Sequence, residues 1–253
     1  EQIKIKGIGR FSPMEVLKST QNGERVTIGQ KVLTKVEVGL PELRKGMKRR
    51  AQIINPKDAG FLLAWMGIGA GQTVLEAGHG SGGLALHLAN VLGENGTLVS
   101  VENRPEHAEV GRDNMTRASK ALKEFPDWTL IEGDVADVSF DEIVEEFDAI
   151  ILDLPEPWPV ISELSKKLRY GGRIACYCPV SSQLEKAWEA CEEAFKEADE
   201  EVGHPVVLAA GHAIGHSIAS CVRLLEAQRV GLPLLERNCR LRAPERMLPI
   251  ASE

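Results

Sequence analysis

The feature that most constrains the fold is a series of short apolar segments that alternate with helical segments from Lys57 onward. The apolar segments do not alternate with polar residues, which is typical of parallel strands that are covered on both faces. We therefore predict an α/β fold, with a Rossmann-like, doubly wound, mostly parallel sheet. The expected strands are 72–76, 96–102, 128–132, 147–152 and, after a turn at Gly171-Gly172, 173–177; the expected helices are 58–66, 84–92, 105–122 and 160–168.

The region before this series has a different pattern. Residues 14–17 and 25–28 are short β-like runs, and Asn22-Gly23 between them is a turn signal. We predict a small β-rich N-terminal module at 1–45 and one larger domain at 46–253. Within that domain 183–201 is expected to be helical, and 198–231 is interpreted as a possible insertion. The sequence starts without an initiator Met, so we expect a trimmed or incomplete product.

Composition excludes several classes of protein. Hydrophobic residues make up 43% and charged residues 26%, so the chain is not intrinsically disordered. No apolar run reaches about 18 residues, so no transmembrane helix is expected, and the N-terminus has no signal-peptide core. Five cysteines without a CxxC pair are interpreted as buried apolar residues of a cytoplasmic protein.

The net charge of −7 argues against a general nucleic-acid coat, but local phosphate contacts need only local positive potential. A basic cluster at 44–50 could supply such contacts, together with Arg240, Arg242 and Arg246. Its alternative interpretation is solvated surface charge.

Chemistry-bearing residues follow the first expected strand. Glu76 precedes a glycine-rich turn in which Gly78, Gly80 and Gly83 satisfy G-x-G-x-x-G, a pattern compatible with a dinucleotide or with another adenosine cofactor. A carboxylate at position 76 would repel a pyrophosphate and suit a positive amino group, such as that of S-adenosylmethionine. The sequence thus favours this cofactor.

Three more acids follow later strands. Glu102 could accept hydrogen bonds from ribose hydroxyls. Asp134 could accept one from an adenine amino group, although Gly-Asp also forms ordinary turns. Asp153 follows a buried strand in a proline-stiffened loop that ends at Trp158, with a helix N-cap as its alternative role. Since ligands bind at the carboxyl ends of such strands, we expect the four acids to converge.

These segments together resemble the tRNA (adenine-58-N1)-methyltransferase family, a branch of the class I S-adenosylmethionine-dependent methyltransferases. The matching segments are R-A-Q-I-I-N-P-K-D at 50–58, L-E-A-G-H-G-S-G-G-L at 75–84, E-N-R-P-E-H-A at 102–108, D-L-P-E-P-W at 153–158 and P-V-S-S-Q at 179–183. They span about 48–190 in the family's order. The resemblance implies S-adenosylmethionine as cofactor, methylation of adenine N1 in the T-loop of tRNA, and a homotetramer.

The resemblance also implies roles for individual residues. Asp153 would be catalytic, accepting a hydrogen bond from the exocyclic amine as the adenine ring becomes cationic. The cofactor would contact Gln52, Glu76, Gly78, His79, Gly80, Ser81, Gly82, Gly83, Glu102, Asn103, Arg104, His107, Asp134, Val135 and Asp153. The tRNA would contact Arg49, Arg50, Pro155 and Trp158. Family members usually have a longer N-terminal module and end in a strand that joins the sheet, and we expect that strand to be absent here.

Other functions stay open at this point. They are a methyltransferase acting on a protein or a small molecule, a non-catalytic tRNA-binding subunit, and an NAD-dependent oxidoreductase. His212 and His216 are four residues apart and could share a helix face as metal ligands, but structural histidines are favoured and no metal is expected.

Overall fold

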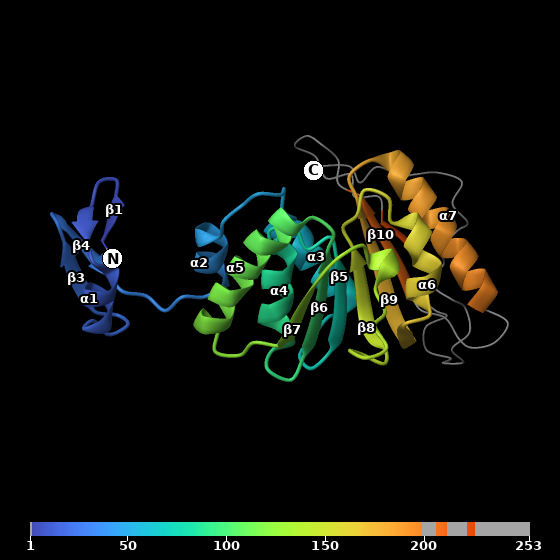
Figure 1. The fold of residues 1–253 in the computed structure, drawn as a ribbon, viewed down its shortest axis with the longest axis horizontal. Coiled ribbons are helices and arrows are strands. Elements are labelled where there is room, and N and C mark those ends of the chain that lie inside the picture. The colour runs from blue at the N-terminus through green and yellow to red at the C-terminus, as the bar shows by residue number, and fades with distance from the viewer. Residues whose placement is uncertain (1, 199–205, 212–221, 226–253) are drawn as a thin grey trace, which may run out of the picture.

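The computed structural model describes residues 2–198, 206–211 and 222–225. Its centre is a seven-stranded sheet in the order β11-β10-β9-β8-β5-β6-β7 (Figure 1). Every neighbouring pair is parallel except β10 and β11, which are antiparallel. The predicted α/β, mostly parallel architecture is confirmed. The strands are β5 (Thr73–Ala77), β6 (Thr97–Glu102), β7 (Asp127–Glu132), β8 (Phe147–Leu152), β9 (Leu168–Cys178), β10 (Val206–Gly211) and β11 (Val222–Leu225).

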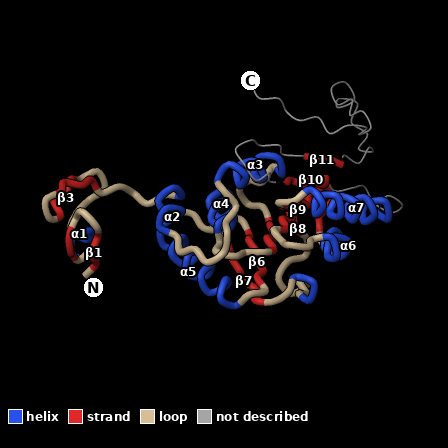
Figure 2. Tube along the Cα trace, turned by 90° about the horizontal axis from the view of Figure 1, so that it is seen from above, coloured by secondary structure: helices blue, strands red, loops and turns tan. Residues whose placement is uncertain are grey.

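Continuous apolar strands produce a core on each face of this sheet. On one face the sheet packs against α3 (Pro56–Met66), α4 (Gly83–Leu92) and α5 (Pro105–Ala121), and α2 (Leu40–Gly46) packs on α4 and α5. On the other it packs against α6 (Ile161–Ser165) and α7 (Ser181–Ala198), where the side chains of Cys176, Cys178 and Cys191 are buried and free. Burial therefore explains why the central strands carry no polar alternation. Seen from above, α2, α3, α4 and α5 lie on one side of the strands and α6 and α7 lie on the other (Figure 2).

The fifth strand differs from its prediction. β9 begins at Leu168, and the expected turn at Gly171-Gly172 lies inside the strand. There the pairing with β8 shifts from Phe147↔Leu168 to Ala149↔Arg173, which marks a bulge. Gly171 has a φ of +75°, a conformation that glycine adopts without a steric penalty. The helix expected at 160–168 is shorter, because a 3-10 turn, η2 (Trp158–Val160), precedes α6.

The N-terminal module contains β1 (Ile3–Ile5), β2 (Gly9–Phe11), α1 (Pro13–Lys18), β3 (Arg25–Ile28) and β4 (Lys31–Thr34), and it stands apart from the sheet (Figure 1). The β-like reading of 14–17 is wrong, because these residues form a helix that begins at Pro13. A proline at the first position favours a helix through its fixed φ. Asn22-Gly23 forms a turn as expected, with Gly23 at a φ of +91°, and a second turn, at Gly29 with a φ of +61°, joins β3 to β4.

Two segments bear on the domain boundaries. Leu43 of α2 is buried in the core of the larger domain, so the packing favours a boundary before Leu40 rather than after residue 45. At the other end, the described residues of the stretch 198–231 extend the central sheet through β10 and β11. The absence of the family's last strand stays a prediction, because 226–253 lie outside the described residues. No described helix combines the length and the hydropathy needed to cross a membrane.

Candidate functional site

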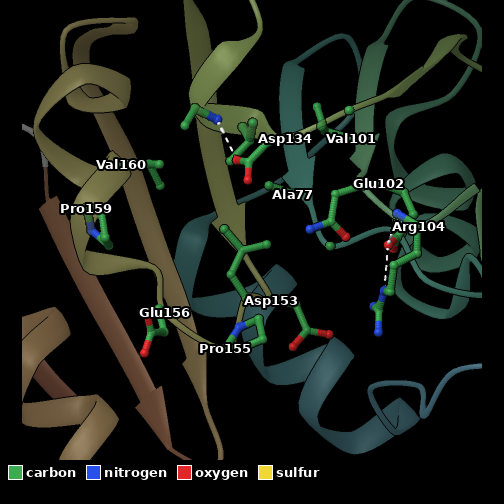
Figure 3. Close-up of a pocket in the computed structure, with 16 residues that line it drawn as sticks. Ala77, Val101, Glu102, Arg104, Asp134, Asp153, Pro155, Glu156, Pro159 and Val160 are labelled. Atoms are coloured by element: carbon green, nitrogen blue, oxygen red, sulfur yellow. Dashed lines mark hydrogen bonds and ion pairs between the residues drawn. The ribbon is translucent and has the colours of Figure 1, made fainter.

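A cavity of about 570 Å³ lies at the carboxyl ends of the parallel strands (Figure 3). This is the place where open α/β sheets bind ligands, and the four successive strand ends β5, β6, β7 and β8 all contribute to it. The lining residues are Ala77, Gly78, Val101, Glu102, Asn103, Arg104, Gly133, Asp134, Val135, Ala136, Asp153, Leu154, Pro155, Glu156, Pro159 and Val160.

Gly78 brings two strand ends into close contact. Its φ is +89°, and a Cβ at this position would lie 2.1 Å from the carbonyl oxygen of Asp153. The backbone N–H of Asp153 in turn donates to the carbonyl of Ala77 at 2.8 Å. The first glycine of the turn therefore lets the end of β8 lie directly against the end of β5.

We expect Gly78→Ala to destabilise the fold by about 2 kcal/mol, because it adds a steric clash to a backbone conformation that alanine rarely adopts. Gly60→Ala is the matched control. Gly60 lies inside α3 with no atom within 4 Å of an added Cβ, so this change should be neutral or stabilise by up to about 1 kcal/mol. Urea unfolding of both variants measures the difference, and equal midpoints would contradict the account of Gly78.

Glu102 is fixed as a carboxylate at the end of β6. Its Oε2 accepts a hydrogen bond from the N–H of Gly80 at 2.6 Å, and its Oε1 accepts two from Arg104, from the backbone N at 3.1 Å and from Nε at 3.0 Å. Burial raises the pKa of Glu102, but these hydrogen bonds outweigh burial, so the pKa lies below its ordinary value. The side chain is therefore charged and already oriented.

Asp153, unlike Glu102, has a pKa above its ordinary value. Burial raises its pKa to about 7, with further contributions from the negative charges of Glu76 and Glu102, while Arg104 opposes the shift. A carboxyl group that titrates near neutrality in a cavity is typical of a functional residue. The alternative role as an N-cap does not apply, because Pro157 is the residue that precedes η2.

Asp134 lies at the cavity and also forms the ordinary turn that its Gly-Asp sequence suggested. It lines the cavity, and its Oδ1 also accepts a hydrogen bond from the N–H of Ala136 at 3.0 Å, which caps the short 3-10 turn η1 (Val135–Asp137). Asn103 and Val135 line the cavity as well, the first exposed and the second buried.

Glu76 lies beneath the cavity instead of lining it. Its carboxylate is 1% exposed, and Oε2 is 3.0 Å from His79 Nδ1 and accepts a hydrogen bond from Ser100 Oγ at 3.0 Å. Trp128 Nε1 donates to Ser100 Oγ at 3.1 Å. Glu76 and His79 thus belong to a buried polar network whose negative charge raises the pKa of Asp153 above them.

Several other predicted cofactor contacts also lie outside the cavity lining. Ser81 is buried and bonds to the backbone at 50–51, and His107 is half-buried on α5. Gln52 is exposed, as are the predicted tRNA contacts Arg49 and Arg50. Gly80, Gly82 and Gly83 form the turn into α4.

The loop after β8 has a support that sequence reasoning did not assign. Gln183 Nε2 donates to the carbonyl of Pro155 at 2.8 Å, and its Oε1 accepts from the N–H of Val180 at 3.2 Å. The sequence signal for this contact is the P-x-x-x-Q segment at 179–183, to which no role is assigned from the sequence alone. Trp158 is half-buried outside the lining, with Lys186 Nζ 4.7 Å from its ring centroid.

The histidines considered as metal ligands, His212 and His216, fall outside the described residues, as do Arg240, Arg242 and Arg246. Within the described ranges no group of three or more His, Cys, Asp or Glu side chains could hold a metal ion.

A family model described as tRNA methyltransferase complex GCD14 subunit matches residues 37–202. The chain belongs to this family. The predicted family is thereby confirmed. The match begins just before α2 and ends just after α7, so it contains every residue that lines the cavity.

Curated relatives of this GCD14-family chain carry related names. The tRNA (adenine(57)-N(1)/adenine(58)-N(1))-methyltransferase TrmI of Methanocaldococcus jannaschii is 37% identical over 180 residues, which are 62% of this chain and 63% of the relative. The tRNA (adenine(58)-N(1))-methyltransferase TrmI of Thermus thermophilus is 33% identical over 153 residues, covering 60% and 58%. The chain thus spans about three fifths of the length of these relatives.

Solved structures support the fold. An S-adenosylmethionine-dependent O-methyltransferase from Thermotoga maritima has a TM-score of 0.61 at 25% identity, covering 76% of this chain and 69% of that one. A tRNA (m1A58) methyltransferase TrmI from Aquifex aeolicus has a TM-score of 0.59 at 24% identity, covering 76% of this chain and 72% of that one.

Proposed function

We propose that the cavity binds S-adenosylmethionine and that the protein methylates N1 of an adenine in the T-loop of tRNA. The observation that carries this proposal is the sign of the cavity's charge. Four carboxylates line it: those of Glu102, Asp134, Asp153 and Glu156. Among the described lining residues Arg104 is the only cation, and it is paired with Glu102. Such a site favours a ligand with sulfonium and amino charges and disfavours a diphosphate.

The residues present fit this cofactor. Glu102 would accept hydrogen bonds from the ribose hydroxyls, and Asp134 would accept one from the adenine amino group. Glu76, buried beneath the cavity, would add to the negative potential around the amino group. Gly133 leaves open space, because no atom lies within 4 Å of the position that its Cβ would take.

Two features would promote methyl transfer: the alignment of adenine N1 with the methyl group, and one fixed negative charge. When bound, the cofactor supplies a methyl group that is already activated by its sulfonium. Adenine N1 has a free lone pair, so the protein needs no strong base there. Asp153 would accept a hydrogen bond from the exocyclic amine and stabilise the positive charge that develops on the ring. The target base would have to leave its stack, as other base-modifying enzymes require.

Positive charge near the N-terminus supports an RNA substrate. Residues 1–38 contain seven Lys or Arg and four Glu, although the whole chain has a net charge of −7. Lys4 and Arg10 lie directly opposite each other in the β1–β2 pair. Like charges at such a position destabilise a strand pair, which is consistent with a polyanionic partner. A homotetramer and a cytoplasmic location are further parts of the proposal, and both rest on the family resemblance.

The retained cavity also argues against the alternative of a non-catalytic tRNA-binding subunit. Such a subunit would need neither the close approach at Gly78 nor a half-buried acid at position 153. A methyltransferase for a protein or a small molecule would share the cavity but would not need the basic segment at 44–50.

We expect the protein to bind S-adenosylhomocysteine and not NAD, because the lining carboxylates would repel the pyrophosphate. Titration calorimetry with both ligands on the same preparation measures this. Micromolar binding of NAD without a response to S-adenosylhomocysteine would identify the cavity as a dinucleotide site.

We expect the double variant Arg49→Glu/Arg50→Glu to bind tRNA about tenfold more weakly at low salt. Its affinity should also depend less on salt, since each lost phosphate contact lowers the slope by roughly one unit. Affinity for S-adenosylhomocysteine should be unchanged, because neither arginine lines the cavity. The measurement is tRNA affinity against salt concentration. Slopes equal to that of the wild type would mean that these arginines are solvated surface charge.

A further inference from the structure

Residues 46–53, here called the strap, cross the outer side of the glycine turn. Ser81, 1% exposed, fixes the strap from below, because its Oγ accepts hydrogen bonds from the backbone N–H groups of Arg50 at 2.9 Å and Ala51 at 3.0 Å. Both acceptor lone pairs of this hydroxyl are used by the two backbone donors. The Ser81 oxygen therefore cannot also accept a hydrogen bond from a ligand.

Asn114 of α5 fixes the strap from the side. It is 2% exposed; its Oδ1 accepts from the N–H of Lys48 at 2.9 Å and its Nδ2 donates to the carbonyl of Lys48 at 2.8 Å. The same Nδ2 donates to the carbonyl of Ser81 at 2.9 Å. One buried amide therefore ties the strap and the glycine turn to each other.

The last glycines of the turn make room for the strap. A Cβ at Gly83 would lie 2.6 Å from Ile53 Cβ, and one at Gly80 would lie 3.3 Å from Ala51 Cβ. The turn thus has two sides. The N–H of Gly80 holds the carboxylate of Glu102 inside the cavity, while Ser81, the next residue, holds the strap outside it.

The strap carries Arg49, Arg50 and Gln52, all exposed. It lies against the glycine turn that follows the carboxyl end of β5. We infer that Ser81 and Asn114 are positioning residues for tRNA: they fix the strap backbone beside the cavity so that its arginine side chains meet the phosphates of the substrate. This inference rests on the proposed function for its tRNA contact, and on the structure alone for the anchoring of the strap.

The anchoring is tested by limited trypsin digestion, because the strap contains the cleavage sites Lys48, Arg49 and Arg50. Ser81→Ala removes the acceptor of two hydrogen bonds, so we expect cleavage at these sites, identified by mass spectrometry, to be about tenfold faster. Ser119→Ala is the matched control: Ser119 is exposed on α5 and bonds within its own helix. Equal cleavage rates in wild type and Ser81→Ala would overturn the anchoring.

Asn114→Asp is a second, independent variant, so the anchoring can still be tested if Ser81→Ala does not fold. It keeps the acceptor for the N–H of Lys48 and removes the donors to the carbonyls of Lys48 and Ser81. We expect the same sites to be cleaved faster. Protection equal to that of the wild type would overturn the role of Asn114.

The tRNA contact is tested by a double-mutant cycle between Ser81→Ala and Arg49→Gln/Arg50→Gln. Each should weaken tRNA binding about tenfold, and the triple variant should bind no more weakly than Arg49→Gln/Arg50→Gln, because Ser81 acts through those arginines. The affinity of Ser81→Ala for S-adenosylhomocysteine should stay within threefold of the wild type.

Two results would overturn this part of the inference. Additive losses would separate Ser81 from the arginines. A tenfold loss of cofactor affinity with unchanged tRNA binding would make Ser81 a cofactor contact, as the glycine motif suggests. If the wild type binds no tRNA, the proposed function fails together with the tRNA contact, whereas the trypsin rates still decide whether the strap is anchored.

Discussion

Asp153→Ala is expected to lose methyl transfer to tRNA by a hundredfold or more while it keeps its affinity for S-adenosylhomocysteine. A fixed charge aimed at a developing charge typically contributes this much to a rate. Asp141→Asn is the control, because Asp141 is an exposed carboxylate paired with Lys167. Single-turnover rates with saturating cofactor isolate the chemical step. A rate near that of the wild type would reduce Asp153 to a structural acid of the cavity.

The titration of Asp153 gives the wild type a pH dependence that Asp153→Ala should lack. Its pKa of about 7 means that the charged form is lost below neutrality, so kcat/KM should rise as the pH increases through this value. Stability should change in the opposite direction. A carboxyl group whose pKa is raised on folding stabilises the fold fully below its unfolded pKa, and this contribution is lost as the pH rises to about 7. Asp153→Asn should therefore unfold at a higher temperature than the wild type at pH 8.

Glu102→Ala is expected to weaken cofactor binding by a hundredfold or more. In the proposed function Glu102 is the charged acceptor for two ribose hydroxyls, and each such hydrogen bond contributes about 1.5–3 kcal/mol. The substitution also frees the N–H of Gly80, which Glu102 holds at 2.6 Å. tRNA affinity in the absence of cofactor should be unchanged, because the strap is held by other residues.

Glu132→Gln is the matched control for Glu102. Both residues end adjacent strands and are register partners, but Glu132 is exposed and paired with Arg112. Calorimetry with S-adenosylhomocysteine should distinguish the two variants clearly. Similar affinities for both would contradict the assignment of Glu102 to the ribose.

The sequence predicted the sheet well because its signal is simple. The run 149–152 in β8 is apolar throughout, and a segment with that pattern is stable only between two layers of helices. The N-terminal module was harder to predict. The run at 14–17 has a β-like composition, yet Pro13 starts a helix there, and this local preference outweighed the composition.

Part of the site could also be predicted, because its acidic residues stand at the ends of the predicted strands. Acids at strand ends are brought together by topology alone, so the cavity contains Glu102, Asp134 and Asp153 as expected. A motif does not reveal which of its members face the ligand. Glu76 and Ser81 belong to the same glycine-rich segment, but one is buried beneath the cavity and the other bonds to the strap. Only the fold shows which direction each side chain takes.

The central claim is tested most directly by incubating the protein with unmodified tRNA and S-adenosylmethionine that carries a labelled methyl group, followed by nucleoside mass spectrometry. The account predicts labelled 1-methyladenosine in fragments that contain the T-loop, and none when Asp153→Ala replaces the wild type. Label in another nucleoside, or in protein or small molecules with tRNA unlabelled, would contradict it.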